Sequence, residues 1–171
     1  MPKRNIFISV GTHPQQFDRL LAEADRISAK NKDLQFFAQI GNSEYEPKNF
    51  GFARFLEEKE YVERFKKSDL IIAHGGAGTI INALELNKPL IVVPRLKKFK
   101  EHTDDHQLDL AKVLEKNGKC LAVYEIERLE NAINNSKDKK YEMSSEKEGI
   151  IKKIKDFIEK EGRKWIFPMS A

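Results

Sequence analysis

Cysteine is nearly absent from this sequence, because Cys120 is the single cysteine among 171 residues. No disulfide can form within the chain, which is typical of a protein from a reducing compartment. Long apolar runs are missing too, since no stretch approaches the ~18 residues that cross a membrane. The apolar run at 6–10 is too short for a signal peptide and lacks a small-residue cleavage site. We therefore expect a cytoplasmic protein that meets a membrane only through its surface or a partner.

Neither sign of charge dominates, as the formal net charge is +4 and the pI is about 9.0. This mild excess favours anionic partners such as nucleotides or an acidic membrane face, without choosing between them. Apolar residues make up 40% of the chain and charged residues 34%, which suits a hydrophobic core beneath a solvated surface. The length suits one domain, which we place over residues 1–171.

Short apolar runs alternate with segments of helical periodicity. They predict strands at 6–10, 34–40, 52–56, 69–73, 90–93 and 120–124, and helices at 15–30, 57–67, 79–87, 105–117 and 126–133. Such alternation predicts an α/β fold with a Rossmann-like, mostly parallel sheet and helices on both faces. Ligands of these sheets bind at the carboxyl ends of the strands, which here lead into the loops 11–14, 74–79 and 95–107.

The last part of the chain has a different composition. Residues 134–148 are polar and predict a solvated loop, after which an amphipathic helix is indicated by Ile150, Ile151, Ile154, Phe157 and Ile158. The tail Trp165-Ile166-Phe167 is apolar. We expect the segment 145–171 to dock a partner, with covering of the domain's own core as the alternative. Without a partner, the chain could self-associate through the same surface.

Three glycines, Gly75, Gly76 and Gly78, separate a predicted strand from a predicted helix. Glycine lets backbone amides approach a ligand closely, and a helix start offers unpaired N–H groups with a partial positive charge. With the Thr79 hydroxyl, this turn forms an anion site suited to a diphosphate, although a tight turn without a ligand fits the same residues. A Walker A loop would need Gly-Lys-Ser/Thr, and the third glycine of a dinucleotide fingerprint is missing.

Two histidine patterns suggest chemistry. His13 follows a glycine and could act as a general base or a phosphate donor, or be a structural loop residue. His102 and His106 are four residues apart, as metal ligands on a helix can be. We expect no metal there, because Asp104 serves equally well as a helix N-cap.

A basic loop follows the predicted strand at 90–93 and contains Arg95, Lys97, Lys98 and Lys100. It could contact a diphosphate or acidic lipid headgroups, or simply be solvated. Nucleic-acid binding is not expected, because no aromatic stacking platform accompanies the charge.

Four separated motifs then occur in order: Val10-Gly11-Thr12-His13, residues 68–79, residues 87–94 and His106-Gln107. Together they resemble the C-terminal domain of family 28 glycosyltransferases. The chain is most similar to cytosolic subunits of two-part UDP-sugar transferases, such as the dolichol-linked N-acetylglucosaminyltransferase and bacterial exopolysaccharide glucuronosyl- and galactosyltransferases.

The resemblance implies one half of a GT-B glycosyltransferase, the half that binds the UDP-sugar donor. A membrane-associated partner subunit would hold the lipid-linked saccharide acceptor and keep this chain peripheral at the inner face of the membrane. A hexosyl group would pass to a polyprenyl-diphosphate-linked acceptor with inversion and without a metal or cofactor. Helix-end amides and basic groups would then stabilise the leaving diphosphate.

The resemblance also assigns site residues. The turn that holds the diphosphate comprises His74, Gly75, Gly76, Ala77, Gly78 and Thr79. The first loop comprises Gly11, Thr12 and His13, and His13 is the candidate catalytic residue. The sugar hydroxyls would contact His106 and Gln107. Asn82 stands where the family usually has a ribose-binding Glu or Asp. It keeps an acceptor oxygen but loses the charge, and Glu85 could substitute or be a solvated helix residue.

Two other functions fit the sequence. A non-catalytic nucleotide-sugar-binding module that stabilises or stimulates a partner transferase is favoured by the missing acceptor half and by Asn82. A nicotinamide-dinucleotide oxidoreductase is suggested by the glycine turn and by Arg95 after the next strand.

Overall fold

The structure is a computed structural model that describes residues 3–137 and 147–160. Its strands form one six-stranded sheet in which all paired neighbours are parallel. The strands are β1 (Arg4–Ser9), β2 (Leu34–Gln39), β3 (Gly51–Ala53), β4 (Leu70–His74), β5 (Leu90–Val93) and β6 (Leu121–Ala122). The six predicted strands are all found, and the two that lie at the sheet edges, β3 and β6, are shorter than predicted.

The strand order β3-β2-β1-β4-β5-β6 reverses direction between β1 and β4. In register, Ile6 of β1 lies beside Leu70 of β4, and Ser9 beside Ala73. The chain leaves β1 toward one side of the sheet and leaves β4 toward the other, which opens a crevice at their carboxyl ends. This switch point is where the order of the strands predicts a ligand.

Six α-helices and two 3-10 turns occur in the described residues. They are α1 (Asp18–Lys30), α2 (Glu58–Lys67), α3 (Ala77–Glu85), η1 (Lys97–Phe99), α4 (His106–Lys116), η2 (Ile126–Arg128), α5 (Leu129–Asn135) and α6 (Lys147–Lys160). The predicted helix at 126–133 is therefore a 3-10 turn followed by α5. The helix predicted at 79–87 begins two residues earlier, because Gly76 takes an extended cap conformation and Ala77 is already helical.

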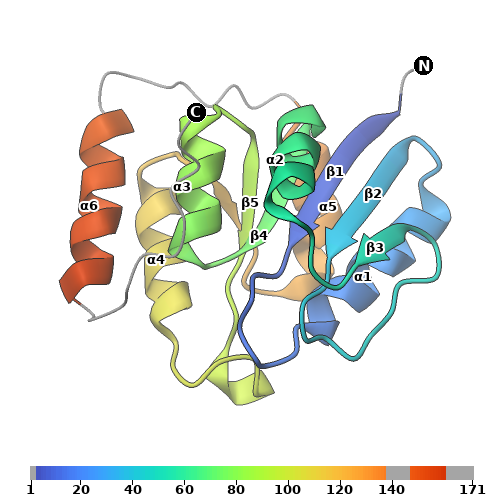
Figure 1. Cartoon of the computed structure of the whole chain (residues 1–171), viewed down its shortest axis with the longest axis horizontal. Helices are drawn as coiled ribbons and strands as arrows, with labels where there is room; N and C mark the ends of the chain where they lie inside the picture. The colour runs from blue at the N-terminus through green and yellow to red at the C-terminus, as the bar shows by residue number, and fades with distance from the viewer. Residues whose placement is uncertain (1–2, 138–146, 161–171) are drawn as a thin grey trace.

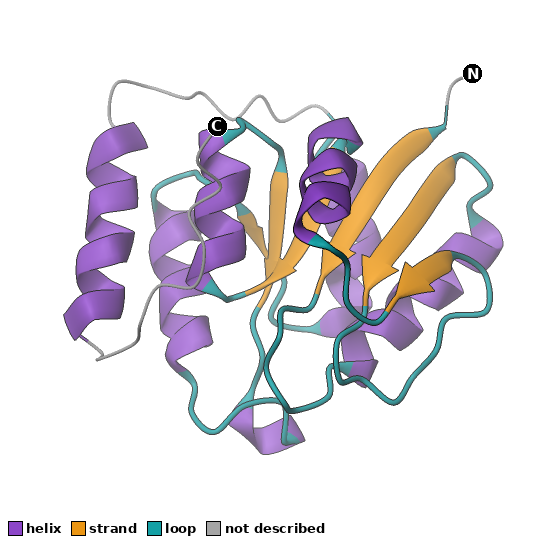
Figure 2. Ribbon diagram, viewed as in Figure 1, coloured by secondary structure: helices purple, strands orange, loops and turns teal. Residues whose placement is uncertain are grey.

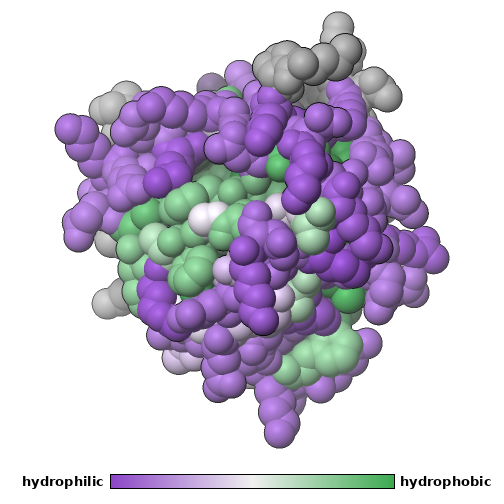
Figure 3. All heavy atoms as spheres, turned by 90° about the vertical axis from the view of Figure 1, so that its right-hand side faces the viewer, coloured by the Kyte–Doolittle hydropathy of each residue, from purple (hydrophilic) through white to green (hydrophobic). Residues whose placement is uncertain are grey.

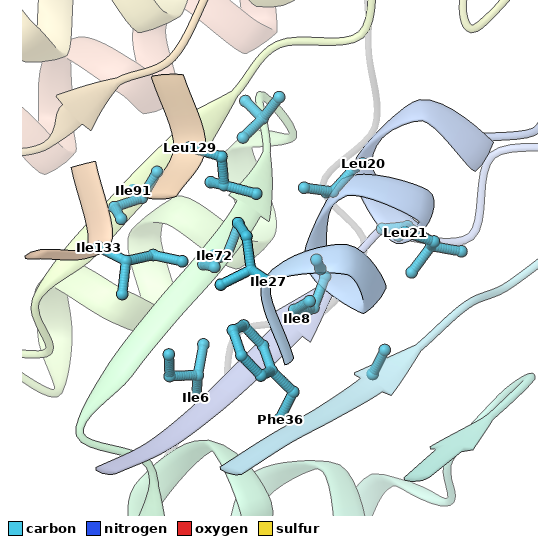
Figure 4. Close-up of a cluster of buried hydrophobic side chains, with 14 of the residues drawn as sticks. Ile6, Ile8, Leu20, Leu21, Ile27, Phe36, Ile72, Ile91, Leu129 and Ile133 are labelled. Atoms are coloured by element: carbon cyan, nitrogen blue, oxygen red, sulfur yellow. The ribbon is translucent and has the colours of Figure 1, made fainter. Parts of the chain in front are cut away.

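The helices cover both faces of the sheet, which confirms the predicted α/β layering (Figures 1 and 2). On one face, α1 and α5 pack on alternate strand residues such as Ile6, Ile8 and Ile72 (Figure 4). On the other face, α2, α3, α4 and α6 pack on the intervening residues, such as Phe7 and Ile71. This alternation follows from the two-residue period of a strand.

Helix α6 lies against α3, and its Ile151 and Ile154 are buried in the second core. Part of its apolar face therefore covers the domain's own core. The apolar tail lies outside the described residues, so partner docking by the segment 145–171 stays a prediction. None of the described helices is both long and apolar enough to span a bilayer.

Hydrophobic atoms also reach the surface on the side where β3 is the edge strand (Figure 3). Phe55, just after β3, is 53% exposed.

Candidate functional site

The three candidate loops meet at the carboxyl edge of the sheet, around the side chain of His74. This residue ends β4 and is buried. Its Nδ1 lies 3.2 Å from the carbonyl oxygen of Ser9 at the end of β1. Because a carbonyl only accepts hydrogen bonds, Nδ1 carries the proton and Nε2 carries a lone pair. Burial lowers the pKa of His74 to about 3, and the nearby Arg95 cation adds to the effect, so the ring is neutral at physiological pH.

The glycines of the turn and of the first loop are required by this imidazole. A Cβ on Gly76 would lie 1.9 Å from His74 Nε2, and a Cβ on Gly11 would lie 2.5 Å from it. Gly11 also has a φ of 78°, which favours glycine. The ring therefore fills the space between the two loops and fixes their separation. These glycines have a packing role whether or not a ligand binds.

Gln107 joins the turn to the end of β5. Its buried Oε1 accepts the N–H of Gly75 at 2.9 Å and the N–H of Arg95 at 3.1 Å. A Cβ on Gly75 would meet Gln107 Cβ at 2.5 Å. Since both lone pairs of the oxygen are used, the amide nitrogen is the part of Gln107 that could meet a sugar hydroxyl. His106 precedes it at the first position of α4, where its backbone N–H donates to Asp104 Oδ1 at 3.1 Å.

Helix α3 starts at the switch point without a side-chain cap and without an acidic residue in its first turn. Its first N–H groups, including those of Ala77 and Gly78, have no intrahelical partner. The buried Thr79 side chain is hydrogen-bonded to Tyr61, whose hydroxyl also lies 3.0 Å from Ser9 Oγ. Thr79 is thus tied to α2, a contact that the sequence did not predict.

Asn82 lies one turn further along α3 and is 6% exposed. Its Oδ1 has no hydrogen-bond partner in the described part of the chain. A buried acceptor that stays unpaired costs free energy. A ligand hydroxyl, such as the ribose hydroxyl predicted for this position, would relieve that cost. Glu85, the suggested substitute, is exposed.

His13 stacks on His102, with ring centroids 4.2 Å apart and planes at 25°. Its Nδ1 lies 3.5 Å from the backbone N–H of Gln15, at the limit of a hydrogen bond. A contact of this length does not fix the tautomer of the ring, so His13 keeps both roles that the sequence left open, general base and hydrogen-bond donor. His102 precedes α4, so it does not share a helix face with His106 as the metal-ligand alternative required.

Arg95 was expected in a basic surface loop, and that expectation is wrong. Its side chain is fully buried. Nη1 donates to the carbonyls of Gln15, Gln16 and Glu101 at 2.9, 2.9 and 3.1 Å, and Nη2 donates to that of Val10 at 2.7 Å. Burial lowers its pKa to about 10, so the guanidinium stays charged at neutral pH. Arg95 therefore satisfies the backbone of the first loop and is not available to a diphosphate or a lipid.

An ion pair that sequence reasoning missed fixes the loop after β5. The buried carboxylate of Glu101 accepts two bonds from Arg19, at 2.8 and 2.9 Å, and a third from the N–H of Leu96 at 3.0 Å. The only sequence feature that could have indicated this ion pair is the acidic Glu101 directly after the four basic residues of the loop. Together, Arg19 and Arg95 anchor both flanks of the loop, so its exposed cations are Lys97, Lys98 and Lys100.

This strand order, with a glycine turn at the switch point, defines a Rossmann-like α/β domain. The chain belongs to the glycosyltransferase family 28 C-terminal domain family, whose model matches residues 5–160. It is 38% identical over 99 residues to the UDP-N-acetylglucosamine transferase subunit ALG13 of Candida albicans, covering 58% of this chain and 30% of that protein. The chain thus spans only about a third of this relative.

A bacterial relative matches over more of the chain. It is the UDP-N-acetylglucosamine–N-acetylmuramyl-(pentapeptide) pyrophosphoryl-undecaprenol N-acetylglucosamine transferase of Thermosipho melanesiensis, 31% identical over 159 residues, with 88% of this chain and 42% of that protein covered. Among solved structures, the NMR structure of ALG13 superposes with a TM-score of 0.57 at 19% identity, covering 81% of this chain and 87% of that one. This likeness confirms the fold.

Proposed function

We propose that the chain is the donor-binding subunit of a glycosyltransferase. It binds a UDP-sugar and, with a membrane-associated partner, transfers a hexosyl group to a polyprenyl-diphosphate-linked acceptor. Membership of the family supports the reaction class. The names of both relatives favour N-acetylglucosamine as the sugar. The family model is that of a C-terminal domain, which fits a donor-binding half, and we propose that a second chain supplies the acceptor half.

The observation that carries the proposal is the uncapped start of α3 at the switch point, with the unpaired Asn82 oxygen one turn away. As the bond to the sugar breaks, negative charge develops on the leaving UDP. The N–H groups of Ala77 and Gly78 and the positive end of the helix dipole would stabilise that charge. Asn82 Oδ1 would accept from a ribose hydroxyl. The base that activates the acceptor is His13 or a residue of the partner.

Calorimetry with UDP and UDP-N-acetylglucosamine tests the proposal. Wild type should bind UDP, and Gly78→Asp should abolish binding, because a carboxylate then meets the diphosphate. Val113→Asp is the matched control, since it adds the same charge at an exposed position on α4 and should bind as wild type does. If the wild-type chain binds no UDP even with its partner present, the proposal fails.

The non-catalytic module remains the second candidate, because the Thr79 side chain and the Gln107 oxygen are engaged within the protein. A Thr79→Ala/His106→Ala double variant separates the two. Full transferase activity of the variant in complex with the partner would favour the module, and a large loss of activity would favour the donor subunit. The oxidoreductase alternative loses its second support, since Arg95 is buried and cannot meet a nucleotide phosphate.

A further inference from the structure

One turn presents an aromatic ring among lysines at the same edge of the molecule as the candidate site. It consists of η1 and the next residue, Lys97-Lys98-Phe99-Lys100, and we name it the basic turn. All four residues are exposed, and Phe99 is 44% exposed. Figure 1 shows η1 projecting beyond the carboxyl ends of the strands. A single exposed apolar side chain is common on proteins, so the combination with three cations is the notable feature.

The basic turn is held firmly from its inner side. The Arg19 guanidinium lies 4.9 Å from the centre of the Phe99 ring, and the Gln16 side chain donates to the Phe99 carbonyl at 3.1 Å. Arg19 is itself fixed by the buried Glu101 carboxylate. These contacts tie the turn to the body of the domain.

The nearby carboxylates are directed at the backbone rather than at the lysines. Asp105 Oδ1 accepts the N–H of Lys97 at 2.9 Å, and Asp104 Oδ1 accepts the N–H of His106. Within residues 3–137 and 147–160, no ion pair joins the ammonium group of Lys97, Lys98 or Lys100 to a carboxylate. The Lys98 ammonium lies 4.8 Å from the centre of the Phe99 ring, and this contact leaves its charge without a carboxylate partner. All three cations can therefore meet an external anion.

We propose that the basic turn contacts the surface of a membrane that contains anionic phospholipids. The ammonium groups would bind the headgroups while the lysine stems and the Phe99 ring enter the interface. A projecting single turn offers no pocket for a small anion and no row of rings for nucleic acid. The deformable surface of an anionic bilayer can accommodate such a projecting turn. Contact there would orient the carboxyl edge of the sheet toward the lipid. This inference goes beyond the proposed function and does not depend on it.

Co-sedimentation of the full chain with vesicles tests the proposal, using phosphatidylcholine with about 30% phosphatidylserine against phosphatidylcholine alone. Wild type should bind the anionic vesicles, bind neutral ones far less, and be released at ~0.5 M salt. Each lysine near an anionic surface contributes about a fivefold gain in partitioning. Lys97→Gln/Lys98→Gln/Lys100→Gln should therefore weaken binding about a hundredfold. Phe99→Ser should weaken it about fivefold, because part of the ring is already covered.

The matched control is Lys112→Gln/Lys116→Gln/Lys152→Gln, which removes the same charge from exposed sites on α4 and α6. It should bind within about twofold of wild type, as only distant charges change. Equal losses in both triple variants, or no binding of wild type to anionic vesicles, would overturn the proposal. UDP titration of the same samples reads the proposed function separately. If the triple variant of the basic turn loses UDP binding as strongly as lipid binding, the lysines of the turn bind the diphosphate and the membrane assignment is wrong.

Discussion

Replacing Arg95 by methionine tests whether this residue holds the first loop in place. Methionine retains the bulk of the stem but leaves the carbonyls of Val10, Gln15, Gln16 and Glu101 without their donor. Breaking a buried, charge-assisted network costs about 3–5 kcal/mol. With a urea m-value of ~2 kcal/mol/M for a chain of this size, the unfolding midpoint should fall by about 1.5–2.5 M.

Two further variants make this test specific. Arg95→Lys keeps the charge but lacks the planar fork that reaches several carbonyls at once, so an intermediate loss of about 1–3 kcal/mol is expected. Lys97→Met removes an exposed cation two residues away and should change stability by less than ~0.5 kcal/mol. Equilibrium urea unfolding, followed by circular dichroism, measures all three. A loss below ~1 kcal/mol for Arg95→Met, or an equal loss for Lys97→Met, would refute the assigned role.

Three other predictions concern single side chains. Burial alone would raise the pKa of Asp25, but hydrogen bonds from the loop 42–50 outweigh burial, and the pKa is lowered. Asp25 therefore stabilises the fold above its unfolded pKa of ~3.9, and this stability is lost as the pH falls through the lower folded pKa. In urea titrations at acid pH, Asp25→Asn should flatten the pH dependence of stability, and an unchanged dependence would contradict the assignment. Gly76→Ala should cost about 1–3 kcal/mol in wild type but much less in a His74→Ala background, and additive losses would show that the imidazole is not the obstacle. Asn82→Ala should weaken UDP binding about fivefold while barely affecting 2′,3′-dideoxy-UDP, so equal losses for both nucleotides would exclude a ribose contact.

The sheet was predictable because its central strands are continuous apolar runs between turns. The stretches 69–73 and 90–93 read directly as β4 and β5, as expected for strands covered on both faces. The start of α3 was predicted two residues late, since Gly75, Gly76 and Gly78 were all read as turn residues. Gly78 in fact lies in the first turn of the helix, where N–H groups need no helical partner and a poor helix former costs little.

The site was less predictable, because residue type does not tell whether a polar side chain meets a ligand or the protein's own backbone. Arg95 was read as a surface cation and Gln107 as a sugar contact. Long-range contacts bury the Arg95 guanidinium, which bonds to Val10, 85 positions away, and engage the Gln107 oxygen, which bonds to Gly75, 32 positions away. The sugar contact of Gln107 stays a prediction for its amide nitrogen. Nothing in the local sequence encodes such partners. The glycines carried the only local signal that the turn is crowded.

The buried side chains of Arg95, His74 and Gln107 also support the proposed chemistry. Loops at the carboxyl edge of a sheet leave many backbone groups without a ladder partner, and here Arg95, His74 and Gln107 supply partners to all three loops. The first loop, the glycine turn and the loop after β5 are thereby held in place without a ligand. Amides that are already oriented need no reorganisation when charge appears on a leaving group, and this preorganisation is what makes such donors effective in a transition state. The three buried side chains would thus support transfer by fixing the groups that touch the donor, so their variants should lose UDP binding and stability together.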